Sequence, residues 1–333
     1  MNAAAVLSLT AAAFALLAAQ PAFGSAPMDL SQDAPRAAVN ADEHPVSTAP
    51  TADPNQKSSS GPAPDSETPR LHKAAFPACP PLPPLIPGKR PFPTGEKLTY
   101  DLDIMGAHAA RMTLGTKAAR SRGGTQVLPI ALQAQTGTLF SKIRSLKADI
   151  RCELDQPSLL PTELLEDVIA NGRRYRHEVT FSSAAEGHSG IGIAWLAGEE
   201  KRGRDDWELP GQALDYLSAF YFFRALQLKP GGAFCADILV LRHLWRVEGT
   251  VAGREHASTP AGEFDVLHLT AKAVRHDKPE DIREVHYWVS DDAYRLPVAA
   301  MGVIDLGTLR AVLTSVHRQD LTLEAASSAG QKW

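Results

Sequence analysis

The sequence is poor in the residues that build metal centres and disulfide frameworks. Cysteine occurs only three times in 333 residues, at Cys79, Cys152 and Cys235, and their spacing excludes a CxxC metal site. Three cysteines in an oxidising compartment allow one disulfide and leave one thiol over. Cys152 and Cys235 both lie in alternating, strand-like runs, so we expect these two to be paired. A bridge from Cys79 to either of them is the alternative.

The chain also lacks an excess of charge of either sign. It has 34 Lys and Arg against 38 Asp and Glu, a net charge of −4, and the two signs are interspersed. Such a balance creates no overall field to gather nucleic acid or an anionic membrane. The short basic run GRRYR at 172–176 is typical of a solvated strand face. We therefore expect no nucleic-acid partner.

Signatures of catalysis and of cofactor binding are missing as well. None of the 11 histidines forms HExxH, and His268 lacks ligand spacing with either His276 or His286. GHSGIG at 187–192 lacks the GxSxG of a nucleophile elbow and the third glycine of a dinucleotide fingerprint, so we interpret it as a loop. The sequence therefore predicts no cofactor and no metal.

One pair of carboxylates invites a catalytic interpretation. Asp291 and Asp292 stand side by side in WVSDDAYRLP, and paired carboxylates can perform general acid and base catalysis. We favour a turn in which the aspartates accept hydrogen bonds from nearby backbone. A hydrolase of an envelope polymer remains the alternative.

The N-terminus predicts export. MNAAAVLSLTAAAFALLAAQPAFGSA has the length of a secretory apolar region, and the small residues Ala22 and Gly24 suit signal peptidase. We expect residues 1–24 to be a signal peptide; an uncleaved anchor helix is the alternative. No later stretch reaches the ~20 apolar residues of a spanning helix. The processed chain should work in the periplasm or outside the cell.

A change of composition separates a linker from a domain. Residues 25–90 hold 14 of the 25 prolines, and such a segment cannot bury enough apolar surface to offset its ordering entropy. We predict a disordered tether here, or a proline-rich ligand at CPPLPPLIPG, residues 79–88. Residues 91–325 are long enough for one domain, followed by a flexible tail at 326–333.

Alternation of apolar and polar residues predicts that the domain is mainly β. KLTYDLDI at 97–104 alternates strictly, and residues 146–154 and 175–181 do the same. Further strand-like runs lie at about 109–116, 126–135, 235–251, 263–273, 283–290, 297–304 and 308–317. One-sided alternation favours a single antiparallel sheet, because strands of a parallel sheet are covered on both faces. TPAGEF at 259–264 predicts a turn.

A single helix stands out against these strands. DYLSAFYFFRALQLKPGG at 215–232 begins with Asp215 as N-cap and ends in Lys-Pro-Gly-Gly. Its polar residues do not gather on one side, so apolar groups surround most of the helix and predict burial on more than one face. We expect the sheet to curve around this helix as a half-barrel or open barrel.

The helix also carries the candidate binding residues Tyr216, Phe220, Phe223 and Arg224. They could line an apolar site, although packing in a plain core explains the same residues equally well. Arg224 could clamp an anionic head group beneath such a site; we favour the alternative that it reaches water past the aromatic rings.

Four stretches give the chain a resemblance to a known family. They are PFPTGEKLTYDLDIMGAHAARMTL, DYLSAFYFFRALQLKPGGAF, TPAGEFDVLHLTAKA and YWVSDDAYRLPVAAMGVIDLGTLRAVLTS, in this order over residues 91–317. Together they resemble the exported bacterial proteins of the domain of unknown function 3108 family. The resemblance implies an exported β-rich domain and implies no activity, cofactor or catalytic residue. The proline-rich tether and Cys79 look like additions to the family domain.

These observations favour a non-enzymatic protein of the cell envelope. Its expected partner is an apolar, lipid-like molecule or another envelope component, and a scaffolding module with a protein partner is a further possibility.

Overall fold

The computed structural model describes residues 68–88, 90–183, 189–199, 201–304 and 307–324. These residues belong to one compact unit. The predicted signal peptide, residues 25–67 of the predicted tether and the predicted tail at 326–333 lie outside the described residues. No helix in the described part of the chain combines the length and the apolar character needed to cross a membrane.

The described residues form 18 strands in one sheet that is not closed. The strands of the first half are β1 (Arg70–Lys73), β2 (Lys97–Ile104), β3 (Ala107–Thr116), β4 (Arg120–Arg122), β5 (Thr125–Thr136), β6 (Leu146–Asp155), β7 (Pro161–Ala170), β8 (Arg173–Ser183), β9 (Ser189–Ala197) and β10 (Lys201–Leu209). Those of the second half are β11 (Ala213–Asp215), β12 (Ala233–Val240), β13 (His243–Thr259), β14 (Gly262–Arg275), β15 (Ile282–Ser290), β16 (Pro297–Ile304), β17 (Gly307–Arg318) and β18 (Leu321–Glu324). A 3-10 helix, η1 (Phe140–Lys142), lies between β5 and β6.

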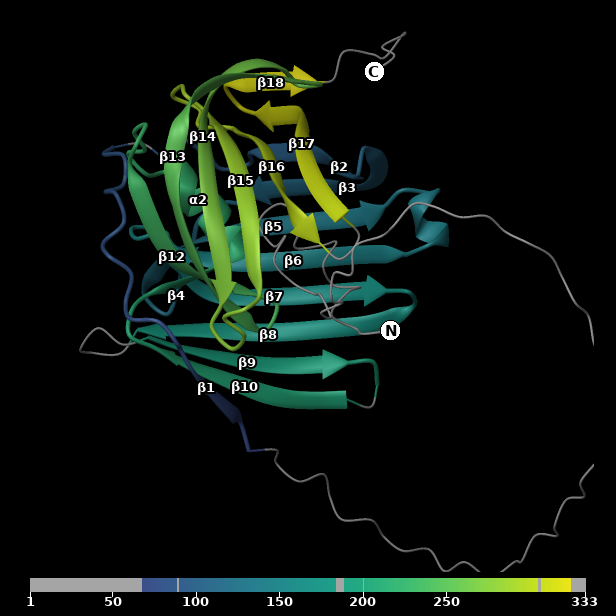
Figure 1. The fold of residues 1–333 in the computed structure, drawn as a ribbon, viewed down its shortest axis with the longest axis vertical. Helices are drawn as coiled ribbons and strands as arrows, with labels where there is room; N and C mark the ends of the chain where they lie inside the picture. The colour runs from purple at the N-terminus through teal and green to yellow at the C-terminus, as the bar shows by residue number, and fades with distance from the viewer. Residues whose placement is uncertain (1–67, 89, 184–188, 200, 305–306, 325–333) are drawn as a thin grey trace, which may run out of the picture. The chain divides into compact units, whose positions relative to one another are not determined.

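The sheet consists of two antiparallel meanders joined edge to edge. Strands β2 to β10 form one meander and β12 to β17 the other, and β2 pairs with β17 where they meet, as Leu102 opposite Ala311 shows. Only the pairings of the short end strands, β1 with β10 and β11 with β12, are parallel among the described strands. In Figure 1, β13, β14 and β15 run at a steep angle to β5–β8. The prediction of a mainly β protein with one long antiparallel sheet is confirmed.

Most predicted strands are present, and their burial alternates as the sequence indicates. β2 and β6 bury every second side chain over most of their length. One predicted run, 235–251, is wrong: the chain turns at Leu241 and Arg242, and two strands result. Leu241 has φ 58°. Because apolar residues lie on both sides of the turn, no break in the sequence pattern marks it. The predicted turn at 259–264 is present, with Thr259 opposite Gly262.

The predicted loop at 187–192 is wrong for its described part. Ser189–Gly192 begins β9, where Gly190 lies opposite Ser182 and Gly192 opposite Thr180. A Cβ atom at Gly190 would stand 2.9 Å from the Ser182 Oγ, and one at Gly192 would stand 3.1 Å from the Thr180 Oγ1. The glycines therefore let the two strands approach closely here. In the sequence the same closely spaced glycines resemble those of a loop.

The aromatic helix α2 (Tyr216–Arg224) is buried at all nine positions. Asp215 is its N-cap, as predicted: its side chain accepts hydrogen bonds from the backbone N–H groups of Leu217 and Ser218. The helix ends at Arg224, well before the predicted stop at Lys229. The Ala225 carbonyl and the Gln227 N–H instead bond to the backbone of residues 84–86, so pairing with that segment replaces the last helical turns.

The segment before the domain is ordered from residue 68, so the predicted disordered tether is wrong for residues 68–88. β1 pairs with β10, and the backbone N–H of Ala75 donates to Nδ1 of buried His276 over 3.0 Å. Buried Arg246 donates to the Pro77 carbonyl. These contacts supply the burial and hydrogen bonding that the local composition lacks.

The disulfide also involves this segment. Cys79 is bonded to Cys235, and Cys152 is a buried free thiol. The predicted Cys152 to Cys235 pairing is therefore wrong. Cys152 faces the N-cap of α2 instead, with its Sγ 3.1 Å from Asp215 Oδ2.

Candidate functional site

Helix α2 is held at both ends by buried polar groups. At its start the Tyr216 hydroxyl donates to Glu166 Oε1 over 2.6 Å, and Nδ1 of His177 lies 2.6 Å from Glu166 Oε2. All three side chains are buried, and burial raises the pKa of Tyr216 well above its ordinary value. The Tyr216 hydroxyl therefore anchors the helix to β7 and is not directed into an open site.

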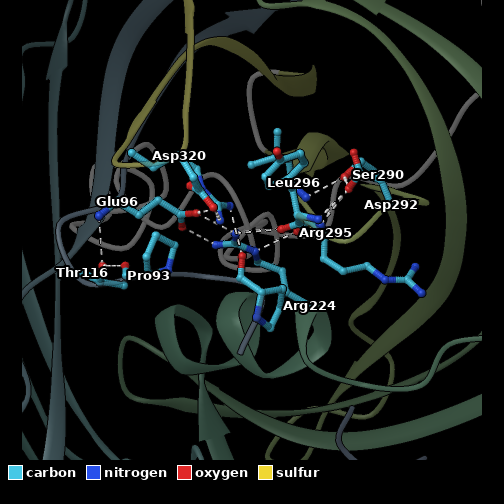
Figure 2. A network of polar contacts seen from close by, with 12 residues as sticks. Pro93, Glu96, Thr116, Arg224, Ser290, Asp292, Arg295, Leu296 and Asp320 are labelled. Atoms are coloured by element: carbon cyan, nitrogen blue, oxygen red, sulfur yellow. Dashed lines mark hydrogen bonds and ion pairs between the residues drawn. The ribbon is translucent and has the colours of Figure 1, made fainter. Parts of the chain in front are cut away.

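At the other end, Arg224 is fully buried and paired. Its Nη1 and Nη2 donate to the two oxygens of Glu96 over 2.6 and 2.9 Å, and its Nε donates to the Arg295 carbonyl. Figure 2 shows the Arg224 side chain between Glu96 and the loop that carries Arg295. Burial alone would lower the pKa of Arg224, but the charge of Glu96 holds it above its ordinary value.

This geometry corrects both predictions for Arg224. The side chain does not reach water, because its exposed fraction is 0%. It is not an open anion clamp either, since Glu96 already occupies its fork in the bidentate arrangement that guanidinium favours. Arg318 adds a second cation 3.3 Å from Glu96 Oε2 and is itself paired with Asp320. The network links the C-terminal end of α2 to the start of β2 and the end of β17.

The two phenylalanines of the predicted site face different neighbours. Phe220 packs edge-on against Tyr100 and is tilted against Tyr287. Phe223 packs edge-on against Phe234, with ring centroids 5.1 Å apart. The structure thus brings together four predicted site residues on one helix, but directs them to separate contacts.

Phe223 lines a small apolar cavity of about 20 Å³. The other residues around it are Phe234, Ile238, Val247, Leu269, Ala271, Val285 and Tyr287. A space of this size holds roughly one water molecule. The cavity in its present form has no room for an acyl chain.

A larger groove is also lined by Phe234 and has a volume of about 290 Å³. Pro83 and Pro84 form one wall, while Gln227, Lys229 and Val251 are among the residues of the other. Phe234 lines both the groove and the interior cavity. The groove was hidden in the sequence, because one wall comes from the predicted tether.

The predicted carboxylate pair is built into a turn. Asp292 Oδ1 accepts from the Ser290 hydroxyl and from the backbone N–H groups of Tyr294 and Arg295. Asp291 pairs with Arg254 and Arg295. The favoured interpretation of these aspartates as turn residues agrees with these contacts, since each carboxylate is already bonded.

A polar cluster on β13, β14 and β15 was missed at the sequence level. The Trp288 indole N–H and His268 Nδ1 both contact the carboxylate of Glu255, at 2.9 and 2.7 Å. His268 stacks on Trp288 with 12° between the ring planes, and its Nε2 lies 2.9 Å from Nδ1 of His286. The register that pairs His268 with Trp288 is a tertiary fact, so no local motif marks this cluster.

Nothing in the described part of the chain assembles a metal centre: no group of three or more His, Cys, Asp or Glu is placed to hold an ion. His268 and His286 contact each other directly, which leaves no space for an ion between those two nitrogens.

Fold and site together define an antiparallel β protein with a buried aromatic helix. A family model described as protein of unknown function, DUF3108, matches residues 99–314. The chain belongs to this family, which confirms the resemblance stated from its sequence.

Three solved structures are similar at low sequence identity. A β-barrel-like DUF1849 protein from Brucella abortus is 8% identical, with a TM-score of 0.46 over 68% of this chain and 98% of that one. A candidate exported protein with a YmcC-like fold from Bacteroides fragilis is 9% identical, with a TM-score of 0.34 over 69% and 98%. A candidate lipoprotein from Parabacteroides distasonis is 11% identical, with a TM-score of 0.32 over 68% and 98%. No curated protein matches the chain.

Proposed function

We propose that this is an exported, non-enzymatic protein of the cell envelope that binds an apolar, lipid-like ligand in the groove beside Phe234. The observation that carries the proposal is that Phe234 lines both a groove and a small apolar cavity. Rotation of one side chain would join the two spaces into a longer apolar channel. Lys229, at the groove, supplies a cation for an anionic head group.

The arrangement of the sheet supports this proposal. Residues that contact α2 or its N-cap come from widely separated strands: Cys152 on β6, Tyr100 on β2, Tyr287 on β15 and Phe234 on β12. Such contacts are those of a sheet curved around the helix as an open half-barrel. In that arrangement the helix occupies the interior, and a ligand enters beside it, past its C-terminal end.

Two features support export. The N-terminal apolar run has the form of a signal peptide. Cys79 and Cys235 form a disulfide, and disulfides persist in oxidising compartments such as the periplasm.

The ligand proposal is tested with protein recovered from the cell envelope. Solvent extraction followed by mass spectrometry should yield an apolar molecule, and a fluorescent fatty acid should bind to the extracted protein. Ala233→Trp, which fills the groove, should weaken this binding at least about tenfold. Ala194→Trp, at an exposed position on β9, is the matched control and should bind normally. Absence of both an extracted molecule and fatty-acid binding would rule out the carrier function.

A further inference from the structure

Exposed apolar side chains gather at one rim of the sheet. Seven large apolar side chains are markedly exposed among the described residues. Six of them are Met105, Leu139, Ile143, Ile169, Ile282 and Val303. All six lie in or beside connections at the same end of the strands, which we call the turn rim. Only Leu71, on β1, lies elsewhere.

Strand register places these connections on one rim. Ile104 at the end of β2 pairs with Leu309 near the start of β17, so the β2–β3 turn lies beside the start of β17. Thr136 at the end of β5 pairs with Ala110 near the start of β3. Leu146 pairs with Ala170, which brings the β5–β6 connection beside the β7–β8 turn. In Figure 1 the β2–β3, β5–β6 and β7–β8 connections follow one another along one side.

Backbone hydrogen bonds tie three of these connections to a neighbouring strand or connection. The N–H of Met105 donates to the Thr308 carbonyl, and the N–H of Gly137 donates to the Ala109 carbonyl, each over 2.9 Å. The N–H of Asn171 donates to the Ser145 carbonyl over 2.9 Å. The rim is therefore a connected surface whose turns hold one another in place.

The most exposed side chains stand at the tips of this rim. Leu139 and Ile143 flank η1 and are 79% and 78% exposed, whereas Phe140 between them packs against the core. Met105 is 77% exposed and has φ 51°, a left-handed conformation that is uncommon for residues other than Gly, Asn and Asp. A large apolar residue thus occupies a tip where the backbone favours a small polar one.

Cations accompany these apolar tips. Lys142 lies in η1, Lys147 is the second residue of β6, and Arg173 begins β8. The nearby carboxylates Asp103 and Asp167 are already paired with Arg310 and Arg174. The even mixture of charges along the chain conceals this arrangement, because register alone brings the cations together on the rim.

We propose that the turn rim docks on a lipid bilayer that contains anionic lipids, with Leu139, Ile143 and Met105 inserted at the head-group boundary. Apolar tips flanked by cations match the apolar and anionic layers of such a surface. This inference rests on the proposed envelope location, and it shares no residue with the groove beside Phe234. The overall charge of −4 does not oppose it, because screening confines the attraction to within about 10 Å of the rim.

Vesicle flotation tests the proposal with the full chain in every case, so that the N-terminus is constant. Vesicles of phosphatidylcholine that contain about 30% phosphatidylglycerol should bind the unmodified protein. Vesicles of phosphatidylcholine alone should bind it about fivefold less. The double variant Leu139→Ser with Ile143→Ser should bind to the vesicles that contain phosphatidylglycerol at least about tenfold less than the unmodified protein. Leu71→Ser, which changes the exposed apolar residue away from the rim, is the matched control and should bind normally.

Equal flotation of the unmodified protein and the Leu139→Ser, Ile143→Ser variant would overturn the proposal. If that variant also loses a crosslink to an envelope protein, the rim is a protein interface instead. Ala233→Trp should float normally, so failure of the ligand groove and failure of membrane docking are separate results. Circular dichroism of each variant establishes that the fold is kept.

Discussion

Arg224 and Glu96, separated by 128 residues in the chain, form a bidentate ion pair in which both side chains are completely buried. Arg224 ends the aromatic helix, and Glu96 immediately precedes β2. The pair therefore joins the helix to the strand at which the two meanders meet. Its burial means that Arg224 without Glu96 would be a charge without water or a counter-ion.

Removal of Glu96 should strongly destabilise the protein. Glu96→Ala leaves Arg224 and Arg318 without their shared carboxylate, which should lower the free energy of unfolding by about 3 to 5 kcal/mol. Urea denaturation measures this loss. The exposed pair Arg111 and Asp101 is the control, because Asp101→Ala should cost less than about 1 kcal/mol. Similar losses for the two variants would contradict the role assigned to the buried pair.

The disulfide should be found between Cys79 and Cys235 in unreduced protein. Peptide mapping by mass spectrometry should show this linkage, with Cys152 as a thiol that reacts only after unfolding. Cys79→Ser should lower the free energy of unfolding by about 2 to 5 kcal/mol, since the bond closes a long loop. A linkage that includes Cys152 would refute the assignment.

The segment from residue 68 to the start of β2 should stabilise the domain beyond its disulfide. A chain that begins at residue 91 loses the donor to His276 and the acceptor for Arg246. It should therefore be less stable than Cys79→Ser by about a further 1 to 3 kcal/mol for each buried group left unpaired. Thermal unfolding of both variants beside a chain that begins at residue 68 measures the difference. Equal stability of the two variants would show that the segment acts only through its disulfide.

The carboxyl of Glu255 should titrate below the ordinary range of glutamate. The hydrogen bond from the Trp288 indole is the main cause of its lowered pKa; burial opposes the shift, and His268 adds to it. The contribution of Glu255 to stability is therefore present above about pH 4.3, the ordinary glutamate value. It is lost as pH falls through the lowered pKa of the folded protein.

Carbon-detected NMR of the side-chain carboxyl follows this titration. Trp288→Phe removes the indole donor and should move the pKa of Glu255 upward. An unchanged titration in the variant would assign the shift to another group.

The sequence was most informative where local rules suffice. Strict alternation placed β2 at 97–104, and the preference for Asp at a helix start placed the N-cap at Asp215. Period-two burial and capping each depend on only a few neighbouring residues. Local rules failed at Leu241, where apolar residues continue through a turn, and at Gly190 and Gly192, which resemble a loop but allow close strand contact.

The candidate site also has features that local rules predict and features that they miss. That Tyr216, Phe220 and Phe223 are buried followed from the apolar character of the helix on all sides. That Arg224 meets Glu96, and that Phe234 lines both a groove and a cavity, depends on residues far away in the chain. No local pattern records such contacts.

By itself, then, the sequence determined the family, the mainly β character and the buried aromatic helix, because composition and periodicity act over short distances. The tertiary structure alone decided which cysteines are bonded, how far the ordered chain extends before β2, and which turns share a rim. Each of these depends on the register of strands that are distant in sequence. Register arises from the packing of the whole sheet, and short stretches do not encode it.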